Sequence, residues 1–247
     1  MISTLWESLL DLLFPPRPGC PFCGAPGSGT EVCCTCLSTI SGYRLEPHCC
    51  LCGRLPEKMA PSAPDGYYLC SECRRHGWPF VLARAAGPYE GILKEVIHRF
   101  KYGGSRRLAV PLAALMVEVL LSETLYANID LVLPVPLTYN KLRRRGFNQA
   151  GLLAKEIGSG LKIPVSGSVL VKITDTPSQT GLSRAAREIN LKNVFKVTDA
   201  RYLQGKNILI VDDVFTTGST MSSAAAVVKR AGAVQVFVVT AATGRCS

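Results

Sequence analysis

The sequence predicts an α/β protein whose parallel sheet carries helices on both faces, preceded by a small cysteine-rich module. From about residue 130, short apolar runs alternate with stretches of helical periodicity, the pattern of strands joined by helical crossovers. Before that region, ten of the 11 cysteines fall between Cys20 and Cys73. The 247 residues suffice for one buried core and a small appended module.

Composition places the chain among globular proteins and gives it a basic surface. Hydrophobic residues make up 47% and charged residues 19%, which excludes a disordered chain. The formal net charge of +10 at pH 7 favours polyanionic partners: a phosphorylated metabolite, nucleic acid or an acidic membrane face. Charge alone does not choose among these, and a basic surface without a specific partner is the alternative.

Residues 1–16 predict an amphipathic helix. Apolar residues recur at helical spacing from Leu5 to Leu13, and Pro15-Pro16 end the pattern. Glu7 and Asp11 interrupt the run, so we do not expect a signal peptide. Nor does any apolar run approach the roughly 20 residues that span a bilayer. We therefore expect a cytoplasmic protein whose first helix packs on its own domain, with docking to a partner or membrane as the alternative.

The cysteine-rich segment, residues 17–79, is expected to bind two structural zinc ions. Eight of its cysteines form four CxxC pairs: Cys20, Cys23, Cys33, Cys36, Cys49, Cys52, Cys70 and Cys73. One CxxC turn brings two thiolates to a metal, and two such turns complete a tetrahedron with no position left for water. We assign the first four cysteines to one zinc ribbon and the last four to a second.

Other interpretations of the cysteines stay open. The pairs could interleave between the two sites, and Cys34 or Cys50 could replace a neighbour as a ligand. Disulfides need an oxidising compartment, for which no export signal is visible. A redox CxxC normally occurs once before a helix, not four times in a short segment.

The rest of the chain, residues 80–247, predicts one α/β domain with a core of its own. Expected strands are Phe80–Ala86, Asp130–Pro134, Val169–Ile173, Asn207–Val211 and Val234–Ala242. Expected helices are Tyr89–Lys101, Arg106–Ser122, Leu142–Gly158 and Ser219–Ala231.

The segment Ile208–Thr220 predicts a phosphate-binding strand, loop and helix. A buried apolar strand delivers Asp212 and Asp213 to the sheet edge where open α/β sheets bind ligands, and carboxylates accept hydrogen bonds from ribose hydroxyls. The residues that follow open a helix whose free N–H groups and hydroxyls can hold a phosphate: Thr216, Thr217, Gly218, Ser219 and Thr220. An ordinary capped helix start is the alternative.

This segment leads to two further expectations, one about how much Asp212 and Asp213 stabilise the fold and one about the space around Gly218. Because the carboxylates are expected beyond the strand and without a buried partner, we expect them to contribute little to folding. A side chain at Gly218 is expected to fill the phosphate cup. A Walker-type NTPase is disfavoured because no Gly-Lys-Ser/Thr occurs here.

Residues 208–220, read as one string, closely resemble the 5-phosphoribosyl-1-pyrophosphate (PRPP) motif of type I phosphoribosyltransferases. Other segments are similar to the ComF family: Leu133–Leu137, Arg145–Ala150, Gln179 with Leu182, Arg187 with Asn190, and Phe195. The CxxC pairs after Pro15-Pro16 also resemble that family. The resemblance covers nearly the whole chain and implies a type I phosphoribosyltransferase-like sheet behind a double zinc ribbon. ComF proteins are associated with DNA uptake, which implies single-stranded DNA and uptake proteins as partners.

By this resemblance, Asp212 and Asp213 would be the catalytic pair that holds the ribose of PRPP. Mg²⁺ would bind with PRPP, and the phosphoribosyl group would pass to a nitrogenous acceptor such as a nucleobase. Six residues are expected to contact pyrophosphate or another polyanion: Val135, Lys141, Arg143, Arg144, Arg145 and Lys172. The stretch from Lys172 to Asn190 stands where these enzymes carry a flexible catalytic loop, and Lys101–Gly104 where they carry a hood over the acceptor.

Two other functions fit the same sequence. The chain could be a non-catalytic DNA-uptake factor that binds single strands, or a regulator that senses PRPP. Strand-binding proteins usually add aromatic platforms to a basic groove, and aromatic residues total only 7% here, which weakens the first alternative. The basic run after Tyr139 could also be a solvated helix start, although cations there oppose the helix dipole.

Overall fold

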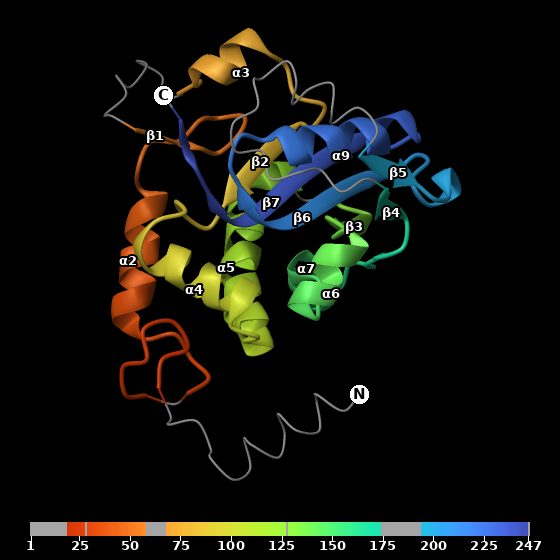
Figure 1. Cartoon of the computed structure of the whole chain (residues 1–247). Helices are drawn as coiled ribbons and strands as arrows, with labels where there is room; N and C mark the ends of the chain where they lie inside the picture. The colour runs from red at the N-terminus through yellow and green to blue at the C-terminus, as the bar shows by residue number, and fades with distance from the viewer. Residues whose placement is uncertain (1–18, 28, 58–67, 127, 174–193, 247) are drawn as a thin grey trace.

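The computed structural model describes residues 19–27, 29–57, 68–126, 128–173 and 194–246. Within them, the centre of the molecule is a parallel sheet of four strands in the order β2-β7-β6-β3 (Figure 1). Its strands are β2 (Leu82–Ala85), β3 (Leu131–Pro134), β6 (Asn207–Phe215) and β7 (Gln235–Thr243). The apolar runs within β3, β6 and β7 suit a sheet that is covered on both faces.

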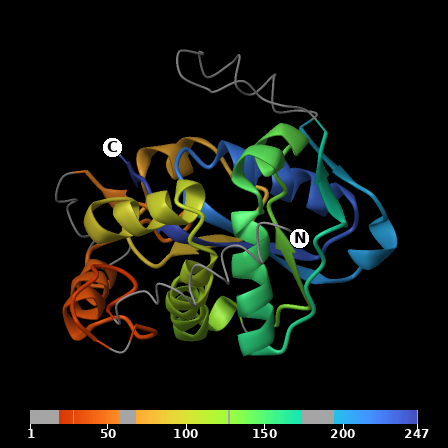
Figure 2. The same ribbon diagram turned by 60° about the horizontal axis from the view of Figure 1, so that its bottom comes forward.

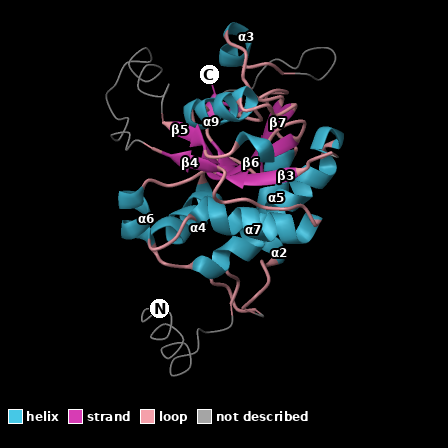
Figure 3. Cartoon of the chain, turned by 90° about the vertical axis from the view of Figure 1, so that its right-hand side faces the viewer, coloured by secondary structure: helices cyan, strands magenta, loops and turns pink. Residues whose placement is uncertain are grey.

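Helices cover both faces of this sheet. Figure 3 shows α9 (Ser219–Arg230) on one side and α4 (Gly91–Tyr102), α5 (Ala109–Ser122) and α7 (Gln149–Leu161) on the other, and Figure 2 looks onto these three. Successive side chains of a strand point to opposite faces of the sheet, so neighbouring residues pack against different helical layers. Val211 packs with the α4, α5 and α7 layer, and Ile210 packs with α9. The predicted α/β fold with a parallel sheet is confirmed.

Three predicted elements differ from the structure. The single helix expected at Leu142–Gly158 is wrong: Gly146, at φ 75°, ends α6 (Tyr139–Arg145), and α7 starts separately after Asn148. The strand expected near residue 170 forms as β4 (Leu170–Lys172), but it pairs antiparallel with β5 (Phe195–Val197) outside the main sheet. Strand β6 continues to Phe215, beyond its expected end at Val211.

The other described elements are short or belong to the cysteine-rich part. They are α2 (Cys34–Arg44), β1 (Leu55–Pro56), α3 (Ser71–Arg75), η1 (Arg106–Leu108), η2 (Thr124–Tyr126), η3 (Ala200–Tyr202) and β8 (Arg245–Cys246). The helix predicted for residues 1–16 and the loop predicted beyond residue 173, up to Asn190, lie outside the described residues.

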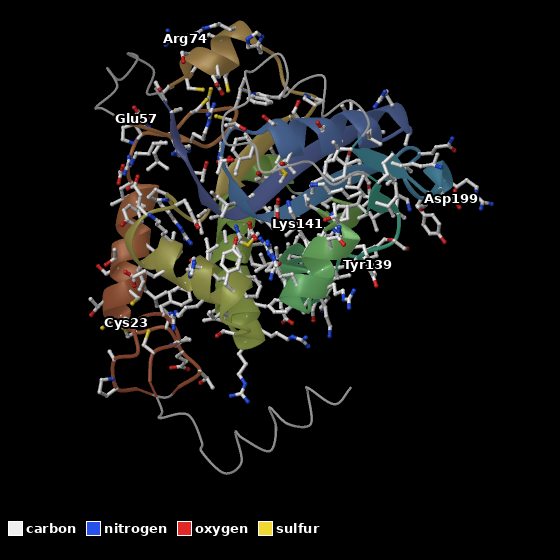
Figure 4. The ribbon with its side chains drawn as sticks, viewed as in Figure 1. Cys23, Glu57, Arg74, Tyr139, Lys141 and Asp199 are labelled. Atoms are coloured by element: carbon white, nitrogen blue, oxygen red, sulfur yellow. The ribbon has the colours of Figure 1, made fainter. Side chains whose placement is uncertain are left out.

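The two cysteine groups lie at opposite ends of the molecule instead of forming one compact module. Helix α2, about 16 Å long, separates them. In Figure 4, Cys23 of the first group and Arg74, next to Cys73 of the second, lie at opposite ends of the view.

Each cysteine group shares a core with the α/β part. Cys36 is buried in the layer with α4 and α5, and Cys49 is buried in the layer with α9. Strand β8 at the end of the chain pairs with β1 of the cysteine-rich part. The core expected for residues 80–247 is therefore shared with the cysteine-rich part and is not separate from it. The boundary at residues 79–80 itself stays a prediction.

Candidate functional site

The two carboxylates lie within strand β6, where we expected a loop. Asp212 stands opposite Thr240 of β7 and is half-buried, whereas Asp213 is 7% exposed. Because neighbouring strand residues point to opposite faces, Asp213 is directed to the helical layer that contains α4 and Asp212 away from it. The pair is thus part of the ordered sheet edge and is not carried by a mobile turn.

Lys101, near the end of α4, meets Asp213 in a buried ion pair. Its Nζ lies 2.8 Å from Asp213 Oδ1, with the two side chains 15% and 10% exposed. Burial alone would lower the pKa of Lys101, but the charge of Asp213 raises it above its ordinary value. The expectation that these carboxylates have no buried partner is wrong. The resemblance to phosphoribosyltransferases predicts Lys101 in a hood over the acceptor, whereas the structure places it at the acid pair.

The surroundings of Asp212 disfavour its charged form. Burial, and then the negative charge of Asp213, raise its pKa to about 7. Lys101 and Lys172 oppose that shift without cancelling it. Lys172, at the end of β4, is thus brought close enough to act on the acid pair, and its Nζ lies 5.5 Å from the ring centroid of Phe195.

The loop between β6 and α9 has the geometry of an anion cup. Gly218 adopts the left-handed conformation at φ 78° and caps α9. Thr216 and Thr217 are exposed, and Thr217 Oγ1 lies 2.9 Å from Ser219 Oγ. The first N–H groups of a helix have no partner within it, so those of α9 are directed to this loop.

A side chain at Gly218 would meet protein behind the loop, not the cup. A Cβ there would lie 2.7 Å from Phe215 Cζ and 2.8 Å from Trp78 Cη2. The expectation that it would fill the phosphate cup is therefore wrong. Glycine is required because the loop rests directly on two aromatic rings.

The loop after β3 lies next to the acid pair, since β3 and β6 are neighbours in the sheet. Val135, expected to contact pyrophosphate, is 5% exposed, and its N–H donates to the carbonyl of Val211. Neither its side chain nor its N–H is available to an anion. Its carbonyl accepts from Asn148 Nδ2 at 3.1 Å, so the start of α7 fixes this loop.

Four polar atoms in the same loop region are buried and have no partner: Thr138 Oγ1, Arg145 Nε, Asn148 Oδ1 and Gln149 Nε2. Buried polar atoms normally have partners, so these four atoms are candidates for contact with a ligand. Asn148 and Gln149 had been noted only for their resemblance to ComF.

The cysteines group as sequence order predicted. The Sγ atoms of Cys20, Cys23, Cys33 and Cys36 lie within 4.8 Å of one another, and so do those of Cys49, Cys52, Cys70 and Cys73. Two sulfur–sulfur distances, Cys23–Cys33 at 3.7 Å and Cys52–Cys70 at 3.8 Å, match the roughly 3.8 Å edge of a tetrahedral zinc–thiolate site. Both donor sets fit zinc, which would cross-link the chain there. Among the described residues, Cys34 and Cys50 stay outside both groups.

Hydrogen-bond donors surround the sulfurs of the second group. Arg54, 4% exposed, donates to Cys52 Sγ at 3.4 Å and also binds Glu72 at 2.7 Å. The backbone N–H of Cys70 donates to Cys49 Sγ at 3.4 Å. The indole Nε1 of Trp78 donates to Cys73 Sγ at 3.0 Å. Such contacts orient metal ligands and offset their negative charge.

Comparison with known proteins identifies the family. Residues 121–247 match the phosphoribosyl transferase domain family. The DNA utilization protein YhgH of Salmonella typhi is 32% identical over 181 residues, which are 72% of this chain and 77% of that protein. The chain belongs to the ComF family of phosphoribosyltransferase-like proteins. Competence protein F of Haemophilus influenzae is 28% identical, over 84% of this chain and 88% of that one. Competence protein ComFC of Bacillus subtilis is 26% identical, over 79% and 76%.

Solved structures similar to this ComF protein are more distant. The glutamine PRPP amidotransferase of B. subtilis, complexed with ADP and GMP, is 19% identical with a TM-score of 0.39, over 57% of this chain and 29% of that one. Adenine phosphoribosyltransferase of Saccharomyces cerevisiae is 17% identical with a TM-score of 0.34, over 59% and 73%. The match thus spans under a third of the amidotransferase chain.

The basic run of this ComF protein consists of Lys141 and residues 143–145, and its side chains have different environments in the structure. It occupies α6, where Tyr139 and Lys141 are labelled in Figure 4. Arg143 and Arg144 are exposed. Arg145 instead donates to Gln149 Oε1 at 3.0 Å and lies over the ring of Tyr102. The three arginines lie in the last turn of α6 and not at a helix start, so the helix dipole favours them.

The described helices include none with the length and apolar character to cross a membrane.

Proposed function

We propose that this ComF protein binds PRPP at the C-terminal end of β6 and transfers its phosphoribosyl group to a nitrogen acceptor, with release of pyrophosphate. The observation that carries the proposal is the position of Asp212 and Asp213 directly before the anion cup of residues 216–220. A 5-phosphoribosyl group needs hydrogen-bond acceptors for its hydroxyls, which the two carboxylates supply, and donors for its phosphate, which the anion cup supplies.

Each part of the site has a role in this proposal. The start of α9, with Thr217 and Ser219, holds the 5′-phosphate through N–H groups and hydroxyls. Asp212 and the second carboxylate oxygen of Asp213 accept from the ribose hydroxyls. Lys101 stabilises the negative charge of Asp213 and keeps it in place. Positive charge that develops on the ribose as the C1′–pyrophosphate bond breaks is then close to fixed carboxylates.

The site also fits Mg²⁺ carried in with PRPP. This ion binds mainly through substrate phosphates and water, so two carboxylates at the strand end suffice on the protein side. When bound, Mg²⁺ offsets the charge of the leaving pyrophosphate. Lys172 and Lys141 are the candidate protein cations for the same charge.

Release of pyrophosphate from PRPP and Mg²⁺, measured with a panel of nucleobases, tests this function. We expect release that depends on one class of acceptor. Tight PRPP binding without release for any acceptor would favour the PRPP-sensing regulator.

A second function, the binding of single-stranded DNA, has an observation of its own. Arg143 and Arg144 project into solvent beside Tyr139, which is 76% exposed, so cations and a stacking surface stand together. The names of the relatives, which refer to competence and DNA utilization, fit this proposal. Proteins of a DNA-uptake system are then the expected partners.

Replacement of both arginines tests DNA binding. For R143A/R144A we expect weaker binding of an oligonucleotide and a log–log salt slope lowered by about 1.4, which corresponds to two phosphate contacts on a single strand. The variant R74A/R75A removes equal charge from exposed residues of α3 and serves as the control. Equal losses in both variants would show that net charge, not this surface, binds the DNA.

A further inference from the structure

The phosphate loop and the second cysteine group are connected through a single side chain, Trp78. Its Nε1 donates to Cys73 Sγ at 3.0 Å. Atoms on the other side of the same indole lie against Gly218, because a Cβ on that residue would stand 2.8 Å from Cη2 and 3.0 Å from Cζ3. One rigid ring system therefore touches both a thiolate ligand and the residue that caps α9.

Aromatic packing leaves the indole little freedom. Trp78 stacks on Phe80 with centroids 5.2 Å apart and an interplanar angle of 15°. Its edge meets Phe215 at 6.3 Å and 70°, and Phe80 meets Phe215 at 6.1 Å and 83°. Phe80 and Phe215 are 5% and 2% exposed. A dense aromatic cluster of this kind transmits a displacement of one member to the others.

The backbone around Phe215 is held as well. Its carbonyl accepts from the N–H of Gly244 at 2.7 Å and from Thr243 Oγ1 at 3.2 Å. The loop after Phe215 thus starts from a fixed point and turns at Gly218, where its next support is the indole. The orientation of Trp78 in turn depends on Cys73 as an acceptor, since a negatively charged sulfur strengthens the N–H···S bond.

We infer that Trp78 is a positioning residue for phosphate binding and that it makes the loop depend on the state of the second cysteine group. With the four thiolates gathered on a metal, the N–H···S bond fixes the indole and the indole fixes Gly218. Once the group is released, Cys73 moves, the indole loses its fixed orientation and the cup at residues 216–220 loosens. The inference rests on the proposed function for its biological meaning, but the coupling itself is measurable without ligand.

Hydrogen–deuterium exchange of the zinc-loaded full chain tests the coupling. In W78F, which keeps a ring on Phe80 but lacks the N–H, we expect the amides of residues 216–220 to exchange about tenfold faster than in the wild type. The control is L112A, which opens a cavity at a buried residue in the layer with α4 and α5, on the opposite face of the sheet. Exchange in W78F within about twofold of the wild type, or no faster than in L112A, overturns the inference.

Metal removal completes the test. Chelation of the wild type should speed exchange at residues 216–220, and chelation of W78F should add less than about twofold, because the connection is already cut. Equal additional effects in both proteins would contradict the coupling.

Binding of ribose 5-phosphate, measured by calorimetry, separates this inference from the proposed function. We expect W78F to bind about tenfold more weakly than the wild type. If the wild type binds and W78F binds equally well, the positioning role is wrong and the proposed function stands. If the wild type does not bind while W78F still loosens the loop, the coupling stands and the proposed function is wrong.

Discussion

At the scale of single residues, the buried Lys101–Asp213 pair makes the two neighbouring carboxylates unequal. Asp213→Asn leaves the Lys101 ammonium buried without its counter-ion, so we expect a loss of about 3 kcal/mol in the free energy of unfolding. Asp212→Asn removes a carboxylate that burial already disfavours, so its cost should be near zero at neutral pH. Urea denaturation of both variants measures the difference.

The double variant K101M/D213N is the control, because it removes both charges. It should recover part of the stability that D213N loses. Equal destabilisation by D212N and D213N would show that the ion pair does not distinguish them.

The raised pKa of Asp212 predicts how the free energy of unfolding depends on pH. Its pKa is about 7 in the folded protein and near 4 when unfolded, so the folded state binds more protons between these values. The contribution of Asp212 to stability is therefore full below pH 4 and is lost as pH rises through 7. Relative to the wild type, D212N should gain stability between pH 5 and pH 8. Denaturation at pH 5 and at pH 8 measures the difference in stability between D212N and the wild type. The same difference at both pH values would contradict a raised pKa for Asp212.

At the scale of elements, the turn from β6 into α9 depends on Gly218. In Gly218→Ala the new Cβ would collide with Phe215 and Trp78, and the left-handed conformation disfavours any side chain. We expect a loss of about 1–3 kcal/mol and a marked fall in affinity for ribose 5-phosphate. Thermal denaturation and calorimetry measure the two effects.

Gly77→Ala provides the matched control for Gly218→Ala, since nothing lies within 4 Å of a Cβ at Gly77. It should change neither stability nor affinity. Equal behaviour of the two variants would show that the aromatic support of the loop does not matter.

The elements show what the sequence could and could not predict. The apolar runs at residues 208–211 of β6 and 236–239 of β7 identified both strands from local pattern alone. The break between α6 and α7 has a local signal in Gly146, but apolar periodicity on both sides concealed it. Strand β4 had the right composition for a strand, but its partner β5 lies beyond a long segment, and pairing partners are not encoded locally.

The residues of the candidate site also divide into those that a local sequence pattern marks and those that it does not. Asp212, Asp213 and residues 216–220 form one short string with a recognisable chemistry, so the sequence was sufficient to find them. Lys101 and Trp78 reach that string from other parts of the chain through tertiary packing, and no local pattern marks them. Val135 looked available because a strand was expected to end before it, whereas its backbone continues the pairing with β6.

At the scale of the whole molecule, both cysteine groups are continuous with the cores of the α/β part. We expect two zinc ions per chain by elemental mass spectrometry on untagged protein. Chelation should lower the melting temperature of the entire chain in one transition, because the metal sites and the sheet share buried residues. Fewer than one zinc per chain, or an α/β transition that chelation leaves unchanged, would contradict this architecture.

Calorimetric titration of the zinc-loaded protein with PRPP and Mg²⁺ is the most direct test of PRPP binding at the end of β6. We expect the wild type to bind and D212N, which should retain its fold, to bind at least about tenfold more weakly, because a ribose hydroxyl loses its carboxylate acceptor. A folded wild type that does not bind at millimolar PRPP contradicts the proposed function. Equal affinity of the wild type and D212N contradicts the role assigned to Asp212 at the end of β6.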